Sequence, residues 1–342
     1  MKKRFLFLIF ASLMLILSAC GDQSKEDVIE GLENKLENLN SYKTEAKMTL
    51  KTGEEEQQYN IEVWHKKPEY YRVMLKNNRD EKGSQIILRN DDGVFVLTPA
   101  LNKSFKFQSD WPFNSSQPYL YASLVDDILK DPEATFEATE DHYVFTTKTN
   151  YQDNKSLPKQ EIYFDKKSYA PAKVRVLDKD NNTLVEVTYA GFEFDKSFED
   201  NAFDMETNMT SGVDGVPVMA NGDGEQLAQE LTVLYPLVTP EGTELEEEKQ
   251  VQLENGERVI LTFKGDKNFT LIEEYKEVQP TSASQTVNVE GDPVNLGFTM
   301  GALKEKSLEW SYKGMDFVLA SEDLTQEEMI EIAQSVTGQG VK

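Results

Sequence analysis

Residues 59–107 read YNIEVWHKKPEYYRVMLKNNRDEKGSQIILRNDDGVFVLTPALNKSFKF. Within this stretch, apolar residues recur at every second position in short runs, which are 59–63, 71–75, 86–88, 94–96 and 105–107. Turn residues separate the runs, as Asp91-Asp92-Gly93 does before the fourth. Runs of this period, divided by turns, are typical of strands joined by hairpins. The stretch therefore predicts an antiparallel meander.

Several of these strands carry apolar residues on both faces. Val63 is followed by Trp64, and Val73 is followed by Met74. A sheet with one face in water alternates more cleanly than this. Two arrangements fit the pattern equally well: one face packs on helices while the other lines an apolar concavity, or both faces are covered in a plain two-layer sandwich. The aromatic residues that we select as candidates for a cleft lining are Trp64, Tyr70, Tyr71, Phe95, Phe105 and Phe107.

The meander belongs to a longer predicted domain, residues 26–206. A helix is expected to begin after Ser24, because this capping serine is followed three residues later by Asp27 and then by leucines at helical spacing. A second helix is expected over 118–130, where Asp131-Pro132 ends it. Further strands are expected at 135–139, 142–148, 159–164, 172–177 and 184–193. The predicted fold class is α+β, mainly antiparallel, with helices packed on the sheet.

A smaller α+β domain, residues 226–342, is expected after a linker. Residues 207–225 contain four glycines and a proline among polar residues, a composition typical of linkers. Near the C-terminus, Thr325 and Glu328 form a capping-box pattern before a helix with one apolar face. Strands of this domain are expected at 249–253, 259–263, 269–274, 286–289, around Phe298, at 307–312 and at 315–320.

Residues 1–19 have the pattern of a secretory signal peptide. Basic residues precede an apolar run at 5–17 that is too short to span a bilayer. The only cysteine of the chain, Cys20, follows Leu17-Ser18-Ala19, as in a bacterial lipobox. We therefore expect a diacylglyceryl group on Cys20 and a lipidated tether over 20–25, which would hold the protein on the extracytoplasmic face of the cell membrane. The alternative is an ordinary secreted protein with a chance cysteine.

The composition narrows the classes of partner and chemistry. The formal net charge is −25, which argues against a nucleic-acid partner. With Cys20 acylated, the chain has no thiol left for a disulfide, a zinc site or a nucleophile. No cofactor is expected.

The sequence contains no convincing catalytic or metal-binding motif. Its only histidines, His65 and His142, lie in predicted strands, and no G-x-S-x-G elbow is present. Residues 178–182 read DKDNN, like the start of a calcium loop, but Thr183 stands where such a loop needs glycine. A hairpin turn explains this segment better. We therefore predict no catalytic residue and no metal site.

The order of motifs in residues 59–107 resembles that of the lipoprotein-carrier (LolA-like) superfamily. A strand ends in a basic residue and a proline, Lys67-Pro68, and a strand with an aromatic-Arg pattern follows at Tyr70-Tyr71-Arg72. An Asp-Gly turn then leads into a strand that ends at Thr98-Pro99. Within the superfamily, the chain is similar to the lipid-anchored, YdcC-like sporulation lipoproteins over residues 26–205. Residues 308–333 are similar to a small extracytoplasmic domain of unknown function.

The resemblance implies an open half-barrel whose apolar concave face, closed off by helices, shelters acyl chains. Lys67 stands where the carrier has arginine and lacks the planar fork of donors, so we do not expect the carrier's gating bond here. An anchor at Cys20 would also prevent long-range shuttling. The chain is therefore expected to be a stationary, non-enzymatic binder of an acyl chain, lipid or lipidated partner, in sporulation or envelope maintenance. The alternative is a protein–protein module that regulates an envelope or cell-wall protein.

Overall fold

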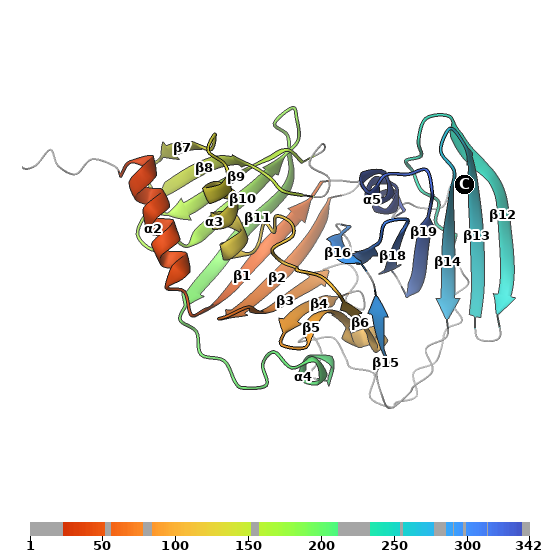
Figure 1. Ribbon diagram of the computed structural model, residues 1–342, viewed down its shortest axis with the longest axis horizontal. Helices are drawn as coiled ribbons and strands as arrows, with labels where there is room; N and C mark the ends of the chain where they lie inside the picture. The colour runs from red at the N-terminus through yellow and green to blue at the C-terminus, as the bar shows by residue number, and fades with distance from the viewer. Residues whose placement is uncertain are drawn as a thin grey trace, which may run out of the picture.

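The computed structural model describes residues 23–51, 56–77, 84–151, 157–210, 233–253, 256–276, 285–289, 291–296, 299–312 and 314–336. These residues form two β-sheets with a small number of helices (Figure 1). The predicted signal, Cys20 and residues 211–225 of the predicted linker lie outside the described residues.

The first sheet has twelve strands in the order β15-β6-β5-β4-β3-β2-β1-β11-β10-β9-β8-β7. Neighbouring strands are antiparallel except for β15 and β6, and the sheet remains open, with β15 and β7 at its edges. The predicted fold class, mainly antiparallel α+β, is confirmed. The strands are β1 (Ser41–Leu50), β2 (Gln57–Lys66), β3 (Tyr70–Asn77), β4 (Gln85–Asn90), β5 (Gly93–Thr98), β6 (Lys103–Phe107), β7 (Thr135–Ala138), β8 (His142–Lys148), β9 (Lys159–Asp165), β10 (Pro171–Leu177), β11 (Thr183–Phe194) and β15 (Gln285–Val289).

The second sheet has seven strands in the order β12-β13-β14-β19-β18-β17-β16. They are β12 (Thr243–Leu253), β13 (Gly256–Gly265), β14 (Phe269–Lys276), β16 (Asp292–Asn295), β17 (Met300–Leu303), β18 (Ser307–Tyr312) and β19 (Met315–Ala320). The helices are α2 (Lys25–Glu37), η2 (Pro99–Leu101), α3 (Tyr121–Lys130), α4 (Met205–Thr210) and α5 (Gln326–Ser335).

Local sequence signals explain where the helices begin. At the start of α2, Ser24 Oγ accepts a hydrogen bond from the Asp27 amide at 3.2 Å, and the Asp27 carboxylate accepts one from the Ser24 amide at 3.2 Å. This is the predicted capping box, and α5 has the same arrangement. The helix expected from residue 118 begins later, at Tyr121, because a turn in which Leu120 N donates to Gln117 O precedes it.

The two faces of the first sheet are covered differently. Helices α2 and α3 pack on one face, which we call the helix face, and bury Val28 and Leu124 completely (Figure 1). Residues 195–210, which we call the strap, include α4 and pack on the opposite strap face. There, Phe203 and Met209 lie against the apolar side chains of β4 and β5. This double cover explains why these strands are apolar on both faces.

The strand β15 departs from the expected division into domains. We predicted a strand at 286–289 within the C-terminal domain, but β15 pairs in parallel with β6 of the first sheet. Three side-chain contacts also join the sheets: Lys103 to Asp316 at 2.6 Å, Asn114 to Asp292 at 3.0 Å, and Gln85 Oε1 to the Met300 amide at 2.7 Å. The two sheets therefore pack as one continuous body, while the domain boundaries drawn from the sequence remain predictions.

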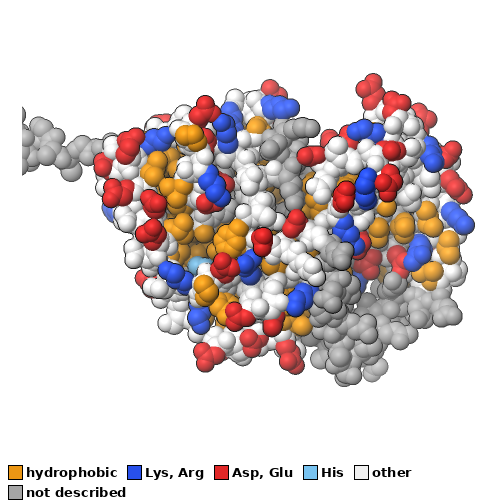
Figure 2. Space-filling model, in the orientation of Figure 1, with side chains coloured by type: hydrophobic (Ala, Val, Ile, Leu, Met, Phe, Trp, Pro, Cys, Tyr) orange, Lys and Arg blue, Asp and Glu red, His pale blue; other side chains and the backbone are white. Residues whose placement is uncertain are grey.

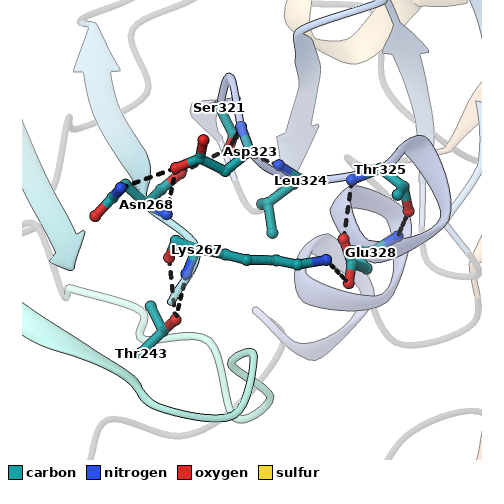
Figure 3. A network of polar contacts seen from close by, with 8 residues as sticks. All are labelled: Thr243, Lys267, Asn268, Ser321, Asp323, Leu324, Thr325 and Glu328. Carbon is teal, nitrogen blue, oxygen red and sulfur yellow. Dashed lines mark hydrogen bonds and ion pairs between the residues drawn. The ribbon is translucent and has the colours of Figure 1, made fainter. Parts of the chain in front are cut away.

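A polar network fixes α5 to the second sheet (Figure 3). The Asp323 carboxylate accepts hydrogen bonds from the Asn268 amide at 2.9 Å and from its side-chain nitrogen at 2.8 Å. Ser321 Oγ donates to Asn268 O at 2.7 Å, and Lys267 forms an ion pair with Glu328 of the capping box. These contacts join the turn before β14 to the start of α5 and position α5 on the sheet.

Glu273 is a fully buried carboxyl group on β14. Its oxygens accept from the Leu234 amide at 3.2 and 3.0 Å, and burial raises its pKa from 4.5 to about 7. The folded protein therefore binds this proton more tightly than the unfolded chain. The stability that this group contributes is complete below about pH 4.5 and is lost as the pH rises through about 7.

We expect Glu273→Gln to raise the free energy of unfolding at pH 8 by about 2–3 kcal/mol, because glutamine keeps an acceptor for the Leu234 amide but carries no buried charge. Below pH 5 the gain should disappear. Urea unfolding at pH 5 and pH 8 measures both values, and Glu246→Gln on the exposed strand β12 is the control. If Glu273→Gln changed the free energy of unfolding equally at pH 5 and pH 8, the raised pKa of Glu273 would be contradicted.

Candidate functional site

Five aromatic side chains gather on the helix face where β1 and β11 pass beside α3. We call them the aromatic floor; they are Tyr42, Tyr121, Tyr189, Phe192 and Phe194. The Phe192 ring stacks on Tyr42 with centroids 4.8 Å apart, and it lies 4.6 Å from Phe194. Tyr42 and Tyr121 are buried, while the other three are partly exposed. Figure 2 shows hydrophobic side chains at the surface over the region of α2 and α3.

A β-bulge places these rings together. Ala46 pairs with Tyr189, whereas its neighbour Glu45 pairs with Gly191, so Ala190 is an extra residue in β11. An extra residue reverses the alternation of side chains beyond it. Phe192 and Phe194 therefore face the same side as Tyr189. Strict period two would have placed them on the opposite face, which is why sequence reasoning missed the floor, although Ala190-Gly191 inside an aromatic strand is a bulge signal.

The hydroxyl of Tyr121 has no hydrogen-bond partner among the described residues, although the side chain is fully buried. The nearby hydroxyls are occupied: Tyr42 Oη accepts from the Tyr121 amide at 3.4 Å, and Tyr189 donates to Pro118 O at 3.2 Å. Burial raises the pKa of Tyr121 far above its usual value, so the hydroxyl keeps its proton and remains a donor. An unpaired buried hydroxyl costs about 1–3 kcal/mol.

Positive charge lies at one end of the floor. Lys35, in the last turn of α2, places Nζ 3.9 Å from the centroid of the Phe194 ring. His65 stacks on Tyr71 at 4.5 Å, and its Nδ1–H donates to Tyr70 O at 3.0 Å. Burial lowers the pKa of His65 to about 4, so it is neutral. Lysine is therefore the charged group beside the aromatic rings.

The space beneath the floor is filled by the protein itself. Trp111, Tyr119, Val125 and Phe164 are completely buried between the helices and the sheet. Interiors packed in this way resist the entry of a large group, because each side chain already has its neighbours. A ligand would therefore lie along the partly exposed rings of the floor rather than in a deep tunnel.

The residues selected from the sequence divide between the two faces. Tyr71, Phe105 and Phe107 lie on the helix face. Trp64, Tyr70 and Phe95 lie on the strap face, where Trp64 stacks on Phe198 of the strap with centroids 5.3 Å apart. The structure does not bring the six together, and their role as a lining remains a prediction.

Lys67, Pro68 and Arg72 occupy structural positions. Lys67 Nζ donates to Glu37 O at 2.9 Å, at the C-terminal end of α2, where a cation is favourable. The peptide bond between Lys67 and Pro68 is cis. Arg72 lies on the strap face, where its Nε donates to Asn208 Oδ1 at 2.6 Å and its guanidinium pairs with Glu62 at 2.9 Å. The motif thus fixes α2 on one face and the strap on the other.

We expect Arg72→Ala to lower the free energy of unfolding by about 2–3 kcal/mol, because Asn208 and Glu62 lose a charged, buried partner. The strap should also become more sensitive to limited proteolysis. Urea unfolding and peptide mapping measure these effects. Lys130→Ala removes an exposed pair with Asp126 and is the control, expected to change stability by less than about 0.5 kcal/mol. Equal losses in the two variants would contradict this role.

Among the described residues there is no group of three or more histidine, aspartate or glutamate side chains arranged to hold a metal ion. The segment that imitates a calcium loop is the hairpin turn between β10 and β11. Asp178 accepts from the amides of Asp180 and Asn182 at 2.9 and 2.8 Å. The described part of the chain also contains no helix that is long and apolar enough to cross a membrane.

The family model described as "Sporulation protein YdcC-like" matches residues 1–203, which include α2, α3 and the aromatic floor. The chain belongs to this YdcC-like family. A second model, a domain of unknown function, matches residues 234–336 of this YdcC-like protein. The described part of that match includes the second sheet and α5.

Among characterised sequences, this YdcC-like chain is 49% identical over 342 residues to the sporulation protein YdcC of Bacillus subtilis, covering 100% of this chain and 99% of the relative. Among solved structures, the MucA/MucB complex of Pseudomonas aeruginosa contains a chain that matches at 10% identity and a TM-score of 0.34, over 93% of this chain and 100% of the other. A LolA-superfamily protein from Nitrosomonas europaea matches at 12% identity and a TM-score of 0.31, over 54% and 100%.

Proposed function

We propose that this YdcC-like protein is a non-enzymatic binding protein, held on the extracytoplasmic face of the membrane by acylated Cys20. The aromatic floor binds the hydrophobic part of an acyl chain, a lipid or a lipidated partner. The proposal places the protein in sporulation or in maintenance of the envelope, in keeping with the name of its Bacillus subtilis relative.

The observation that carries the proposal is the unpaired hydroxyl of Tyr121 in the middle of partly exposed aromatic rings. Its ring lies 5.7 Å from Phe192 and 5.8 Å from Phe194. A ligand with a carbonyl or hydroxyl beside an alkyl chain would satisfy both parts of this surface. The chain would cover the rings, and its oxygen would accept from the buried Tyr121 hydroxyl once the partly exposed Phe192 and Phe194 rings move aside.

Lys35 sets a further condition on the ligand. Its ammonium group lies beside Phe194, close enough to meet the polar end of a bound amphiphile. A carboxylate or phosphate at that end gains from the charge, whereas a cationic end is repelled. The floor therefore favours a neutral or anionic amphiphile over a cationic one.

The second candidate function is a protein–protein module that regulates an envelope or cell-wall protein. The filled space beneath the floor favours it, because completely buried side chains such as Trp111 and Tyr119 leave a shallow surface rather than a deep cavity. In that case the exposed rings would receive apolar side chains of a partner. The two functions differ in one testable respect. A lipid-binding protein binds a free amphiphile in the absence of any protein partner, whereas a protein–protein module does not.

Tyr121→Phe provides the sharpest test. In the mature chain with Cys20→Ala, we expect the variant to bind 11-(dansylamino)undecanoic acid about fivefold more weakly, because about 1 kcal/mol of hydrogen bonding is lost. The melting temperature without ligand should not fall, since the hydroxyl has no partner to lose. Fluorescence titration and thermal unfolding measure the two effects. Tyr163→Phe, whose hydroxyl donates to Glu161 at 3.0 Å elsewhere on the sheet, is the matched control.

Native mass spectrometry of the chain purified from its own host complements the titration. A copurified amphiphile, released by Phe192→Ala, would support binding at the floor. Absence of any bound amphiphile, together with no thermal shift on adding fatty acids or phospholipids, would contradict lipid binding and favour the protein–protein module.

A further inference from the structure

Gln23, just before α2, is held by two tyrosine hydroxyls from distant parts of the chain. Its Oε1 accepts from Tyr143 at 3.0 Å and from Tyr169 at 2.7 Å. Tyr143 lies on β8 and is 5% exposed, while Tyr169 lies in the turn between β9 and β10. The two rings are 6.0 Å apart. We call Gln23, Tyr143 and Tyr169 the stem clamp.

The surrounding chain is shaped to bring Tyr169 to this position. Gly31 lies inside α2, where glycine is less favourable than alanine. A Cβ at Gly31 would lie 2.7 Å from the Tyr169 hydroxyl oxygen and 2.8 Å from Cζ, so the ring needs the glycine. Tyr169 itself has a positive φ of 59°, which is unfavourable for an aromatic residue. Two locally unfavourable features, the glycine inside α2 and the positive φ of Tyr169, thus accompany the hydrogen bond from Tyr169 to Gln23.

The residues that follow Gln23 are also held firmly. Ser24 and Asp27 form the capping box of α2, and Lys25 Nζ donates to Ala134 O just before β7. The stem clamp therefore joins directly to a helix that is fixed to the sheet. Of the predicted tether, the described residues Gln23 to Lys25 are thus bonded to the sheet or to α2.

The distance from the clamp to the anchor is set by covalent geometry. Only Gly21 and Asp22 separate Cys20 from Gln23. Three steps of 3.8 Å between Cα atoms reach about 11 Å at most. Covalent geometry therefore limits an acylated Cys20 to this distance from Gln23, and Gln23 is held at the end of the first sheet that carries β7 and β8.

We propose that the stem clamp orients the protein on the bilayer: the end with the β7–β8 turn faces the lipid surface, and the second sheet points away from it. The inference rests on the acylation of Cys20 in the proposed function. In Figure 1, α2 with β7 and β8 lies at one end of the long axis, and β12 lies at the other. The second sheet is thus presented to partners away from the membrane.

Energy transfer from single labels tests the orientation. Because the only natural cysteine is acylated, D141C in the β7–β8 turn and Q250C on β12 can each be labelled in the full acylated protein. The protein is placed in phosphatidylglycerol–phosphatidylcholine vesicles that contain rhodamine-labelled lipid. We expect transfer from the D141C label to be at least fivefold greater than from the Q250C label.

The clamp is tested by Gln23→Ala with Tyr169→Phe, which removes the acceptor and one donor but keeps the ring against Gly31. The ratio of transfer between the two labels should fall at least twofold, while Tyr163→Phe leaves it unchanged. Equal transfer from both labels in the parent protein, or an unchanged ratio in the double variant, would overturn the proposed orientation and leave the acylation of Cys20 in place. An intact mass without a diacylglyceryl group would overturn both the acylation and the orientation.

Discussion

Replacing Cys20 by alanine is expected to move the protein from the membrane fraction to the soluble fraction almost completely. The signal, residues 1–19, is exchanged for a cleavable secretion signal without a lipobox, so that an uncleaved signal cannot hold the variant. The strongly negative formal net charge, −25 for the full sequence, opposes adsorption of the variant to anionic lipid. In the proposed function, two acyl chains on Cys20 supply the stable anchoring that the variant would lack.

The measurement is fractionation of cells grown with labelled palmitate. The parent protein should carry the label and sediment with membranes, whereas Cys20→Ala should carry none and be at least tenfold enriched in the soluble fraction. Ser24→Ala, four residues further on, removes a cap of α2 without touching the lipobox and should behave like the parent. Retention of unlabelled Cys20→Ala in the membrane would contradict lipid anchoring.

Removing the exposed rings of the floor is expected to have the largest effect on binding. Phe192→Ala with Phe194→Ala should weaken binding of 11-(dansylamino)undecanoic acid by about 10–100-fold, because each lost aromatic contact is worth about 1 kcal/mol or more. Both rings are partly exposed in β11, so they contribute less to the core than the buried Tyr42 and Tyr121.

Phe198→Ala is the matched control for the floor variant. Phe198 is also a partly buried aromatic residue, but it packs against Trp64 on the strap face. Its removal should leave the dissociation constant within about twofold of the parent value. If both variants lose affinity equally, the probe does not bind at the floor. Thermal unfolding of each variant separates loss of the site from loss of the fold.

Local signals were sufficient to predict much of the fold from the sequence. The capping pattern at Ser24 and Asp27 predicted the start of α2, because the same two residues satisfy the free amides of the first turn. Period two predicted β2 to β6. The double-faced strands β4 and β5 left two arrangements open, an apolar concavity on one face or cover on both, and the structure covers both faces. These features depend on neighbours in the sequence, which pattern analysis can detect.

The floor and the strap depend on contacts between distant residues and could not be predicted in the same way. Phe192 reaches the helix face only because Ala190 is an extra residue in the pairing with β1. Phe198 and Phe203 cover the strap face from a segment with little regular structure, so periodicity gives no sign of them. Half of the selected aromatic residues consequently lie on the face opposite the floor.

The strand β15 shows the same limit. A strand at this position was expected. Its partner, however, depends on which sheet edge lies beside it in the folded chain, and that edge strand is β6. A short strand has no pattern of its own that specifies a partner. The strand expected at 286–289 was therefore found, but its pairing with β6 could not be predicted from the sequence.

Binding of a hydrophobic group to the aromatic floor is tested most directly by photo-crosslinking. A fatty acid with a diazirine at the middle of its chain is added to the mature chain with Cys20→Ala, illuminated, and located by peptide mass spectrometry. We predict saturable labelling confined to peptides that contain Phe192, Phe194 and Tyr121, reduced at least tenfold in the Phe192→Ala, Phe194→Ala variant. Labelling that does not saturate, or that is spread evenly over both sheets and is unchanged in the variant, would contradict the proposed site.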